Sequence, residues 1–129
     1  MIRIRLNSIF VDDQNKALRF YTQVLGFDKK HDLSVGEYKW LTVVSPAGPQ
    51  ELELVLEPNA NPAAKTYQQA LFDQGIPATA FEVDDLDAEI ARLHAADVVF
   101  KGPAISAGAV RIAIFSDTCG NWIQLYQPS

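Results

Sequence analysis

The sequence predicts an α+β fold built from two βαβββ modules in one chain. The triplet Val-Asp-Asp occurs at residues 11–13 and recurs at residues 83–85. Each copy follows a run with the polar-apolar alternation of a β-strand and precedes a stretch with helical spacing of apolar side chains. Each helical stretch is followed by three more strand-like runs. The shared order of these patterns indicates one structural unit present twice.

The first module begins with a strand-like run over residues 3–11. A helix is predicted over residues 14–26, because apolar side chains recur there at three- and four-residue spacing. Asp13 is a favoured N-cap for this helix, and Gly26 supplies its C-terminal stop. Three strands follow over residues 27–35, 37–45 and 50–58.

The second module repeats this order. Its first strand is predicted over residues 77–83 and its helix over residues 86–97, with Asp85 as the N-cap. Three strands are expected over residues 97–103, 109–116 and 121–127.

We therefore expect a single domain over residues 1–129. Module one covers about 1–57, a connector with a short helix at 63–75 covers 58–75, and module two covers 76–129. The connector is long enough for the modules to pack within one chain or to exchange across a dimer, and the sequence leaves both open.

Composition and charge exclude several classes of protein. The chain has 48% hydrophobic and 21% charged residues, as a globular domain does. Its formal net charge of -5 has the wrong sign for a nucleic-acid binder. No apolar run approaches the ~20 residues of a membrane span. Cys119 is the only cysteine, so no intrachain disulfide forms. We expect a soluble, cytoplasmic protein with neither nucleic acid nor membrane as its partner.

Two motifs resemble those of the vicinal oxygen chelate superfamily, which contains glyoxalases, extradiol dioxygenases and bleomycin-resistance proteins. The opening motif is V-x-D-x6-F-Y-x3-LGF, from Val11 to Phe27, and the closing motif is D-x2-GN-x-I-x-L, from Asp117 to Leu125. The resemblance spans about residues 2–126. It implies a glyoxalase/bleomycin-resistance-like fold in which the two modules form a cupped mixed sheet, with the site on the concave face.

The resemblance also implies four positions for the ligands of a divalent metal. They are Leu6 and Ala78 on the first strands of the modules, and Glu53 and Gln124 on the last strands. Leucine and alanine offer no donor atom, whereas a transition metal normally takes three or four protein ligands. We therefore expect no cofactor and no metal ligands of the usual kind, although a weakly held divalent cation stays open.

Strand alternation suggests which side chains line the concave face. The ligand-binding residues expected there are Ser8, Phe10, Trp40, Glu53, Trp122 and Gln124. Trp40 and Trp122 suit stacking on a planar or cationic ligand. Glu53 is the candidate catalytic base, because a carboxylate in a largely apolar cup either has a raised pKa and acts as a base, pairs with a cationic ligand, or faces water at the rim. We interpret His31 as a solvated edge residue and Asp117 as the cap of a turn.

Two functions follow as hypotheses. The first is a small-molecule-binding protein similar to bleomycin-resistance proteins, without the four-ligand metal site. The alternative is a glyoxalase-like lyase, isomerase or dioxygenase, with Glu53 as base, Gln124 orienting the substrate and a weakly held metal. A homodimer is expected for either function, because the sheets leave apolar edges that a second copy can cover.

Overall fold

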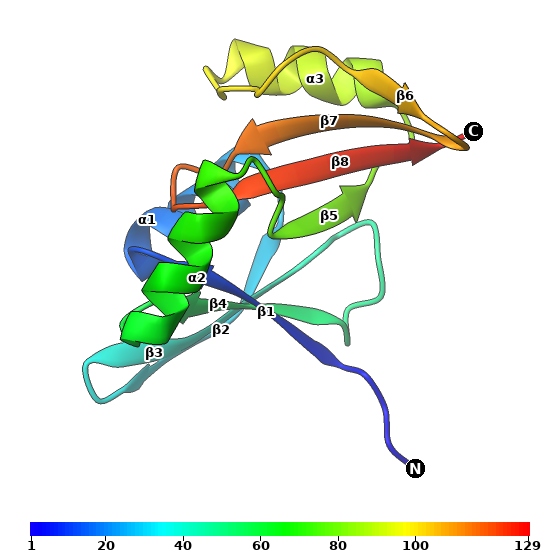
Figure 1. The fold of residues 1–129 in the computed structure, drawn as a ribbon. Coiled ribbons are helices and arrows are strands. Elements are labelled where there is room, and N and C mark those ends of the chain that lie inside the picture. The colour runs from blue at the N-terminus through cyan, green and yellow to red at the C-terminus, as the bar shows by residue number, and fades with distance from the viewer. The chain divides into compact units, whose positions relative to one another are not determined.

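The computed structural model describes residues 1–129 and divides the chain into two compact units (Figure 1). The first unit comprises Met1–Lys65 and the second Thr66–Ser129. The boundary lies inside the segment that the sequence marks as a connector.

The first unit contains one four-stranded mixed sheet with the strand order β1-β4-β3-β2. Strands β1 and β4 are parallel, and the other neighbours are antiparallel. Its helical segment, on the β1–β2 connection, packs against β4. The elements are β1 (Leu6–Val11), α1 (Gln14–Arg19), η1 (Phe20–Val24), β2 (Asp28–Val35), β3 (Tyr38–Val44) and β4 (Glu53–Pro58).

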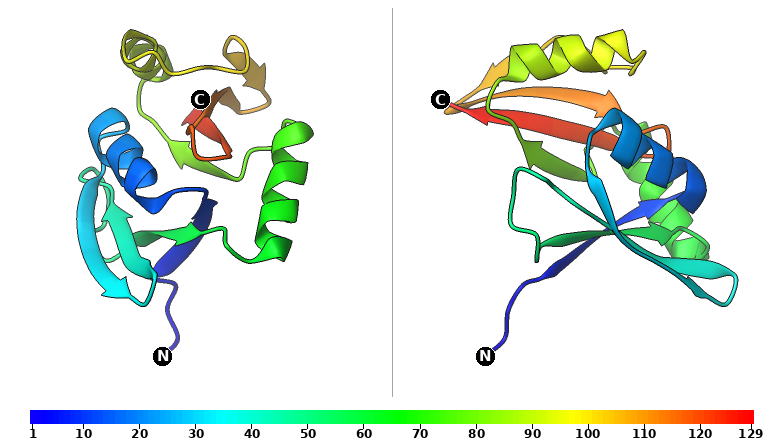
Figure 2. Two further views of the ribbon diagram at one scale, coloured as in Figure 1. Left: turned by 90° about the vertical axis from the view of Figure 1, so that its left-hand side faces the viewer. Right: turned by 180° about the vertical axis from the view of Figure 1, so that it is seen from behind.

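The second unit repeats this topology, with the strand order β5-β8-β7-β6 and a parallel β5–β8 pair. Helix α3 lies along β7 and β8, as Figure 2 shows from two directions. The two mixed sheets and their helices confirm the predicted α+β class. The elements are α2 (Pro62–Asp73), which begins in the first unit, β5 (Thr79–Glu82), α3 (Leu86–Ala95), β6 (Ile105–Ala107), β7 (Val110–Ser116) and β8 (Trp122–Pro128).

The predicted helix caps are confirmed. The Asp13 carboxylate accepts a hydrogen bond from the Lys16 amide at 3.0 Å, and the Asp85 carboxylate accepts one from the Ala88 amide at 3.1 Å. Both carboxylates therefore satisfy amides that have no partner inside the helix. Gly26, with φ +88°, ends the first helical segment in the left-handed conformation that favours glycine.

The first helix is shorter than the pattern over residues 14–26 indicates. The α-helical part ends at Arg19, and Phe20–Val24 continue as a π-helical turn. The Leu25 amide donates to the Phe20 carbonyl at 3.1 Å, which is the five-residue spacing of that turn. Apolar periodicity cannot reveal this change, because Phe20 and Tyr21 are buried in either geometry.

The prediction of a strand over residues 97–103 is wrong. Asp97 has φ +62° and turns the chain out of α3, and Phe100 forms only an isolated bridge with Phe115 of β7. Pro103 has no amide to continue a ladder. The strand that pairs with β7 is β6, a few residues later.

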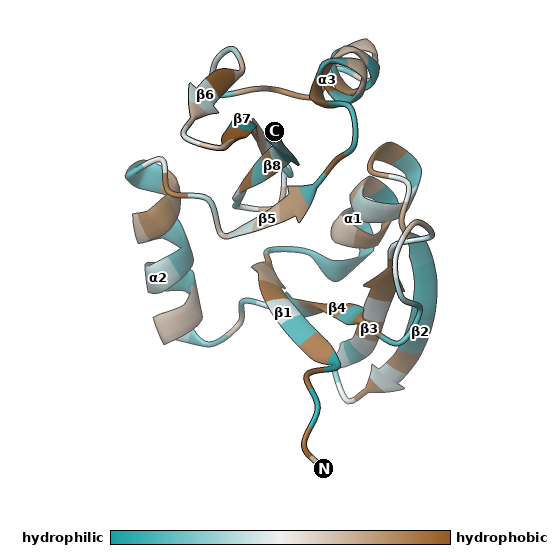
Figure 3. Ribbon diagram, turned by 90° about the vertical axis from the view of Figure 1, so that its right-hand side faces the viewer, coloured by the Kyte–Doolittle hydropathy of each residue, from teal (hydrophilic) through white to brown (hydrophobic).

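Each unit has an apolar core between its helix and its sheet. The hydropathy colouring of Figure 3 shows apolar and polar residues alternating along several strands. The longest helix, α2, has 12 residues, which is fewer than a membrane-spanning helix needs. The largest buried core side chains are Tyr21, Leu41 and Leu56 in the first unit, and Leu86, Leu93, Phe115 and Ile123 in the second.

Candidate functional site

In the first unit, the predicted ligand-binding residues share one face of the sheet. Ser8 lies opposite Val55, and Val55 lies opposite Thr42. Because side chains two apart along a strand point the same way, Phe10, Glu53 and Trp40 lie on this face as well. Ser8 is exposed and donates a hydrogen bond from its hydroxyl to the Glu57 carboxylate at 3.2 Å, whereas Phe10 is half-buried.

Glu53 is the most densely contacted of these residues. Its Oε1 accepts a hydrogen bond from Thr42 Oγ1 at 2.8 Å and lies 3.4 Å from His31 Nε2. Its Oε2 lies 3.7 Å from Lys30 Nζ. The carboxylate is thus held by a hydroxyl, an imidazole and an ammonium group of its own unit. This arrangement leaves it less free to accept a ligand cation than the sequence suggested.

A β-bulge explains how Lys30 and His31 both reach Glu53. Consecutive residues of a regular strand point to opposite faces. The β2–β3 register shifts between Lys29 and His31, so that Lys30 is the extra residue on β2. A bulge re-aims side chains locally. His31 is therefore part of the candidate site and not simply a solvated edge residue, and no sequence signal marks the bulge.

Trp40 belongs to an apolar strip on the β2–β3 hairpin. It lies opposite Leu33, and the next pair on the same face is Tyr38 with Val35. Leu33, Val35 and Tyr38 remain 59%, 62% and 42% exposed. The Trp40 indole N–H has no hydrogen-bond partner in the protein. The strip combines an apolar surface with an unused donor.

In the second unit, Trp122 is fixed by Phe72 of α2. The two rings stack at 4.8 Å between centroids with an interplanar angle of 4°, and Trp122 Nε1 donates to the Phe72 carbonyl at 3.1 Å. One face of the indole and its only donor are therefore used inside the unit. Any ligand would meet Trp122 through its remaining ring surface.

Gln124 lies on the same face of the second sheet as Trp122. It pairs with Ala80 on one side and with Ile114 on the other. Its side chain is half-buried, and its amide makes no hydrogen bond within the protein. An amide that both donates and accepts, set among apolar neighbours, suits recognition of a polar group on a ligand.

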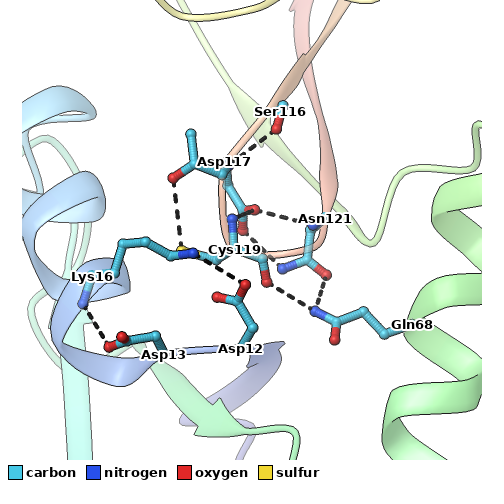
Figure 4. Close-up of polar contacts among 9 residues, drawn as sticks. Asp12, Asp13, Lys16, Gln68, Ser116, Asp117, Cys119 and Asn121 are labelled. Carbon is cyan, nitrogen blue, oxygen red and sulfur yellow. Dashed lines mark hydrogen bonds and ion pairs between the residues drawn. The ribbon is translucent and has the colours of Figure 1, made fainter.

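The β7–β8 turn is structural, as predicted for Asp117 (Figure 4). The buried Asp117 carboxylate accepts hydrogen bonds from the amides of Cys119 at 2.7 Å and Asn121 at 3.1 Å. Gln68 of α2 donates to the Cys119 carbonyl at 3.2 Å. Cys119 is fully buried, so its thiol is shielded from solvent.

The donor atoms at the four family positions do not fit a transition-metal site. Leu6 and Ala78 present only carbon. In the first unit Leu6 pairs with Glu53, but in the second Gln124 pairs with Ala80 and not with Ala78. The residue equivalent to Gln124 in the first unit is therefore Val55, the partner of Ser8. No group of three or more His, Cys, Asp or Glu side chains is placed to hold a metal ion.

Comparisons with known proteins agree with this fold. The protein YurT of Bacillus subtilis (strain 168) is 49% identical over 126 residues, covering 98% of this chain and 99% of its own. The crystal structure of UcmS2 is 30% identical, with a TM-score of 0.83 and 98% of each chain covered. TnmS3, an antibiotic binding protein from Streptomyces sp. CB03234, is 32% identical, with a TM-score of 0.78, 100% of this chain and 98% of its own covered.

The sequence model of the Glyoxalase/Bleomycin resistance protein/Dioxygenase superfamily matches residues 3–125, nearly the whole chain. The two four-stranded βαβββ units are the architecture that this match implies. The chain therefore belongs to the glyoxalase/bleomycin resistance protein/dioxygenase superfamily, which confirms the resemblance seen in its motifs.

Proposed function

We propose that this protein binds a small organic molecule on the sheet faces that carry Trp40 and Gln124, and that it does so without the four-ligand metal site. The similarity to TnmS3, an antibiotic binding protein, supports a role in holding such a molecule. The observation that carries the proposal is Gln124. On the last strand of the second unit, this side chain presents an amide with no hydrogen-bond partner in the protein.

The proposed contact residues are Ser8, Phe10, Trp40, Glu53, Trp122 and Gln124. Ligand sites are typically apolar and aromatic with a few polar groups that fix orientation. Trp40 in the first unit and Gln124 in the second each add an unused polar group to an otherwise apolar surrounding. Both groups would gain a hydrogen bond on binding without losing one to the protein.

A thermal-shift screen of planar drugs and small metabolites tests the proposal. A bound compound should raise the melting temperature, since ligand binding to the folded state stabilises it. The shift should be reduced in Trp40→Ala or Gln124→Ala. Tyr67→Ala is the matched control, because Tyr67 is a 62% exposed aromatic residue on α2. Shifts that survive in both test variants would contradict the proposed contacts.

Calorimetric titration with Mg²⁺, Mn²⁺, Ni²⁺ and Zn²⁺ tests the metal-free part of the proposal. The expected result is no stoichiometric site, because Leu6 and Ala78 supply no donor atom. A one-to-one complex that is lost in Glu53→Ala would instead support the enzyme alternative. In that alternative Glu53 is the base, and the weakly held metal binds beside it.

A further inference from the structure

We propose that the β2–β3 face of the first unit is selective for planar aromatic ligands with an acidic hydroxyl group, and that His31 and Lys30 recognise this hydroxyl. The inference rests on the proposed function, because it specifies the chemical class of the ligand. It differs from the cationic ligand that a free Glu53 carboxylate would favour.

The Glu53 carboxylate is less exposed to solvent than the two basic side chains that contact it. The Glu53 side chain is 14% exposed, whereas those of Lys30 and His31 are 34% and 42% exposed. Thr42, which donates to Glu53, is fully buried. A ligand that approaches from solvent therefore meets the ammonium and the imidazole before the carboxylate.

Each of these two groups keeps one unused hydrogen-bonding position. Lys30 Nζ donates to the Gln50 carbonyl at 2.8 Å and faces Glu53, so one of its three N–H groups remains. The contact of His31 Nε2 with a carboxylate places the ring proton on Nε2. Nδ1 then carries a lone pair, and it has no partner in the protein.

An acidic hydroxyl fits both positions at once. Its O–H can donate to His31 Nδ1 while its oxygen accepts from Lys30 Nζ. An ammonium ligand would lack an acceptor for Lys30, and an ether would lack the proton for His31.

The apolar strip beside this cluster sets the shape of the ligand. The pair Leu33 and Trp40 lies next along the strands to the pair His31 and Thr42, on the same face. Residues two apart in a strand are separated by roughly 7 Å, which is comparable to the length of a fused aromatic ring system. A ring resting on Trp40 would bring its hydroxyl to His31 Nδ1. Figure 3 shows the change of β2 from hydrophilic to more apolar toward its end.

The probes for the test are 2-naphthol, 2-methoxynaphthalene and 2-naphthylmethylammonium, which share one ring system and differ in the polar group. Dissociation constants are measured with the full chain by tryptophan fluorescence and calorimetry. We expect 2-naphthol to bind about 3- to 10-fold more tightly than the methyl ether, as for one net hydrogen bond. The ammonium probe should bind most weakly.

Variants assign this preference to residues. His31→Leu should bring 2-naphthol close to its ether, because only the naphthol donates a proton to His31. Lys30→Met should weaken both probes alike, because both oxygens accept from Lys30 Nζ, while Lys29→Met, on the same strand, should leave both affinities unchanged.

Three results would overturn the inference. They are equal affinity for 2-naphthol and its ether, a preference that persists in His31→Leu, and no binding of any probe. If Leu33→Ser and Val35→Ser change the molar mass in solution and leave probe binding unaltered, the strip is a contact with a second copy. None of these results decides the proposed function, which is tested separately by the thermal-shift screen with Trp40→Ala and Gln124→Ala.

Discussion

At the scale of single residues, Gly120 illustrates how tightly the β7–β8 turn is built. Its φ is +99°, and a Cβ there would lie 2.8 Å from Nε2 of the buried Gln68. That amide donates to the Cys119 carbonyl and to Asn121 Oδ1. An added methyl group would therefore strain the backbone and displace two hydrogen bonds.

Gly120→Ala should lower the free energy of unfolding by roughly 2–4 kcal/mol, from left-handed strain and the lost bonds of Gln68. Gly108→Ala is the matched control, because Gly108 has φ +64° and nothing within 4 Å of a built Cβ. Gly108→Ala should lower the free energy of unfolding by about 1–2 kcal/mol. Urea unfolding measures both, and equal losses would mean that the Gln68 contact does not matter.

Asp13 gives the protein one pH-dependent contribution at the residue scale. The hydrogen bond from the Lys16 amide holds the pKa of the Asp13 carboxyl below its ordinary value of 3.8. A lowered folded-state pKa stabilises the fold above the unfolded pKa, and this contribution disappears as the pH falls through the folded one. Asp13→Asn retains a capping oxygen but does not titrate.

The difference in unfolding free energy between the wild type and Asp13→Asn should therefore be constant above pH 5. As the pH falls below about 4, the wild type should lose stability relative to Asp13→Asn. Urea titrations from pH 6 to pH 2.5 measure this difference. A difference that is independent of pH would show that the cap makes no ionic contribution.

Residue-level chemistry was only partly predictable from the sequence. Alternation was enough to predict that Glu53 and Trp40 share a face, because both strands are regular there. The role of His31 could not be predicted, since a bulge has no residue signature in Lys29-Lys30-His31. The free amide of Gln124 and the occupied indole of Trp122 depend on packing, which alternation does not specify.

At the scale of elements, the Gln14 side chain ties α1 to the ends of β3 and β4. Its Nε2 donates to the carbonyls of Lys39 and Leu56, both at 2.9 Å, and its Oε1 accepts from the Lys39 amide at 3.0 Å. The β3–β4 ladder is short, with the pairs Thr42–Val55 and Val43–Leu54. Beyond these two pairs, the Gln14 side-chain amide makes the hydrogen bonds to the β3 and β4 backbone that a neighbouring strand would otherwise make.

Gln14→Ala should lower the free energy of unfolding by about 1.5–4.5 kcal/mol, for three part-buried hydrogen bonds at about 0.5–1.5 kcal/mol each. Gln14→Glu retains the acceptor oxygen and loses the N–H donors, so it should also lower the free energy of unfolding. Gln23→Ala, an exposed position on the same helical segment, is the control. Hydrogen exchange of the Lys39 amide should accelerate in Gln14→Ala, and unchanged exchange would contradict this role.

The element scale also shows where pattern reasoning fails. The strands of both hairpins β2–β3 and β7–β8 were predictable, because their alternation is regular and turn residues separate them. The Val-Val-Phe run at 98–100 has strand propensity, but the left-handed Asp97 and Pro103 keep it to a single bridge. Local backbone geometry overrode residue preference there.

At the scale of the whole molecule, the expected oligomer is a homodimer. Leu6 and Ile105 are large apolar side chains that are 49% and 55% exposed, and they lie on the edge strands β1 and β6. Exposed apolar groups on unpaired edges favour association with a second copy. Light scattering on an eluting peak should give twice the chain mass of 14.3 kDa. A monomer mass across the micromolar range would exclude the dimer.

The central claim is that this member of the superfamily binds an organic ligand without a metal. The most direct measurement is the dissociation constant of a ligand found in the screen, determined by calorimetry with and without EDTA. Because the four family positions offer one carboxylate and one amide, the account predicts the same constant under both conditions and a weaker one in Gln124→Ala. Loss of binding in EDTA, restored by one equivalent of a divalent cation, would contradict it.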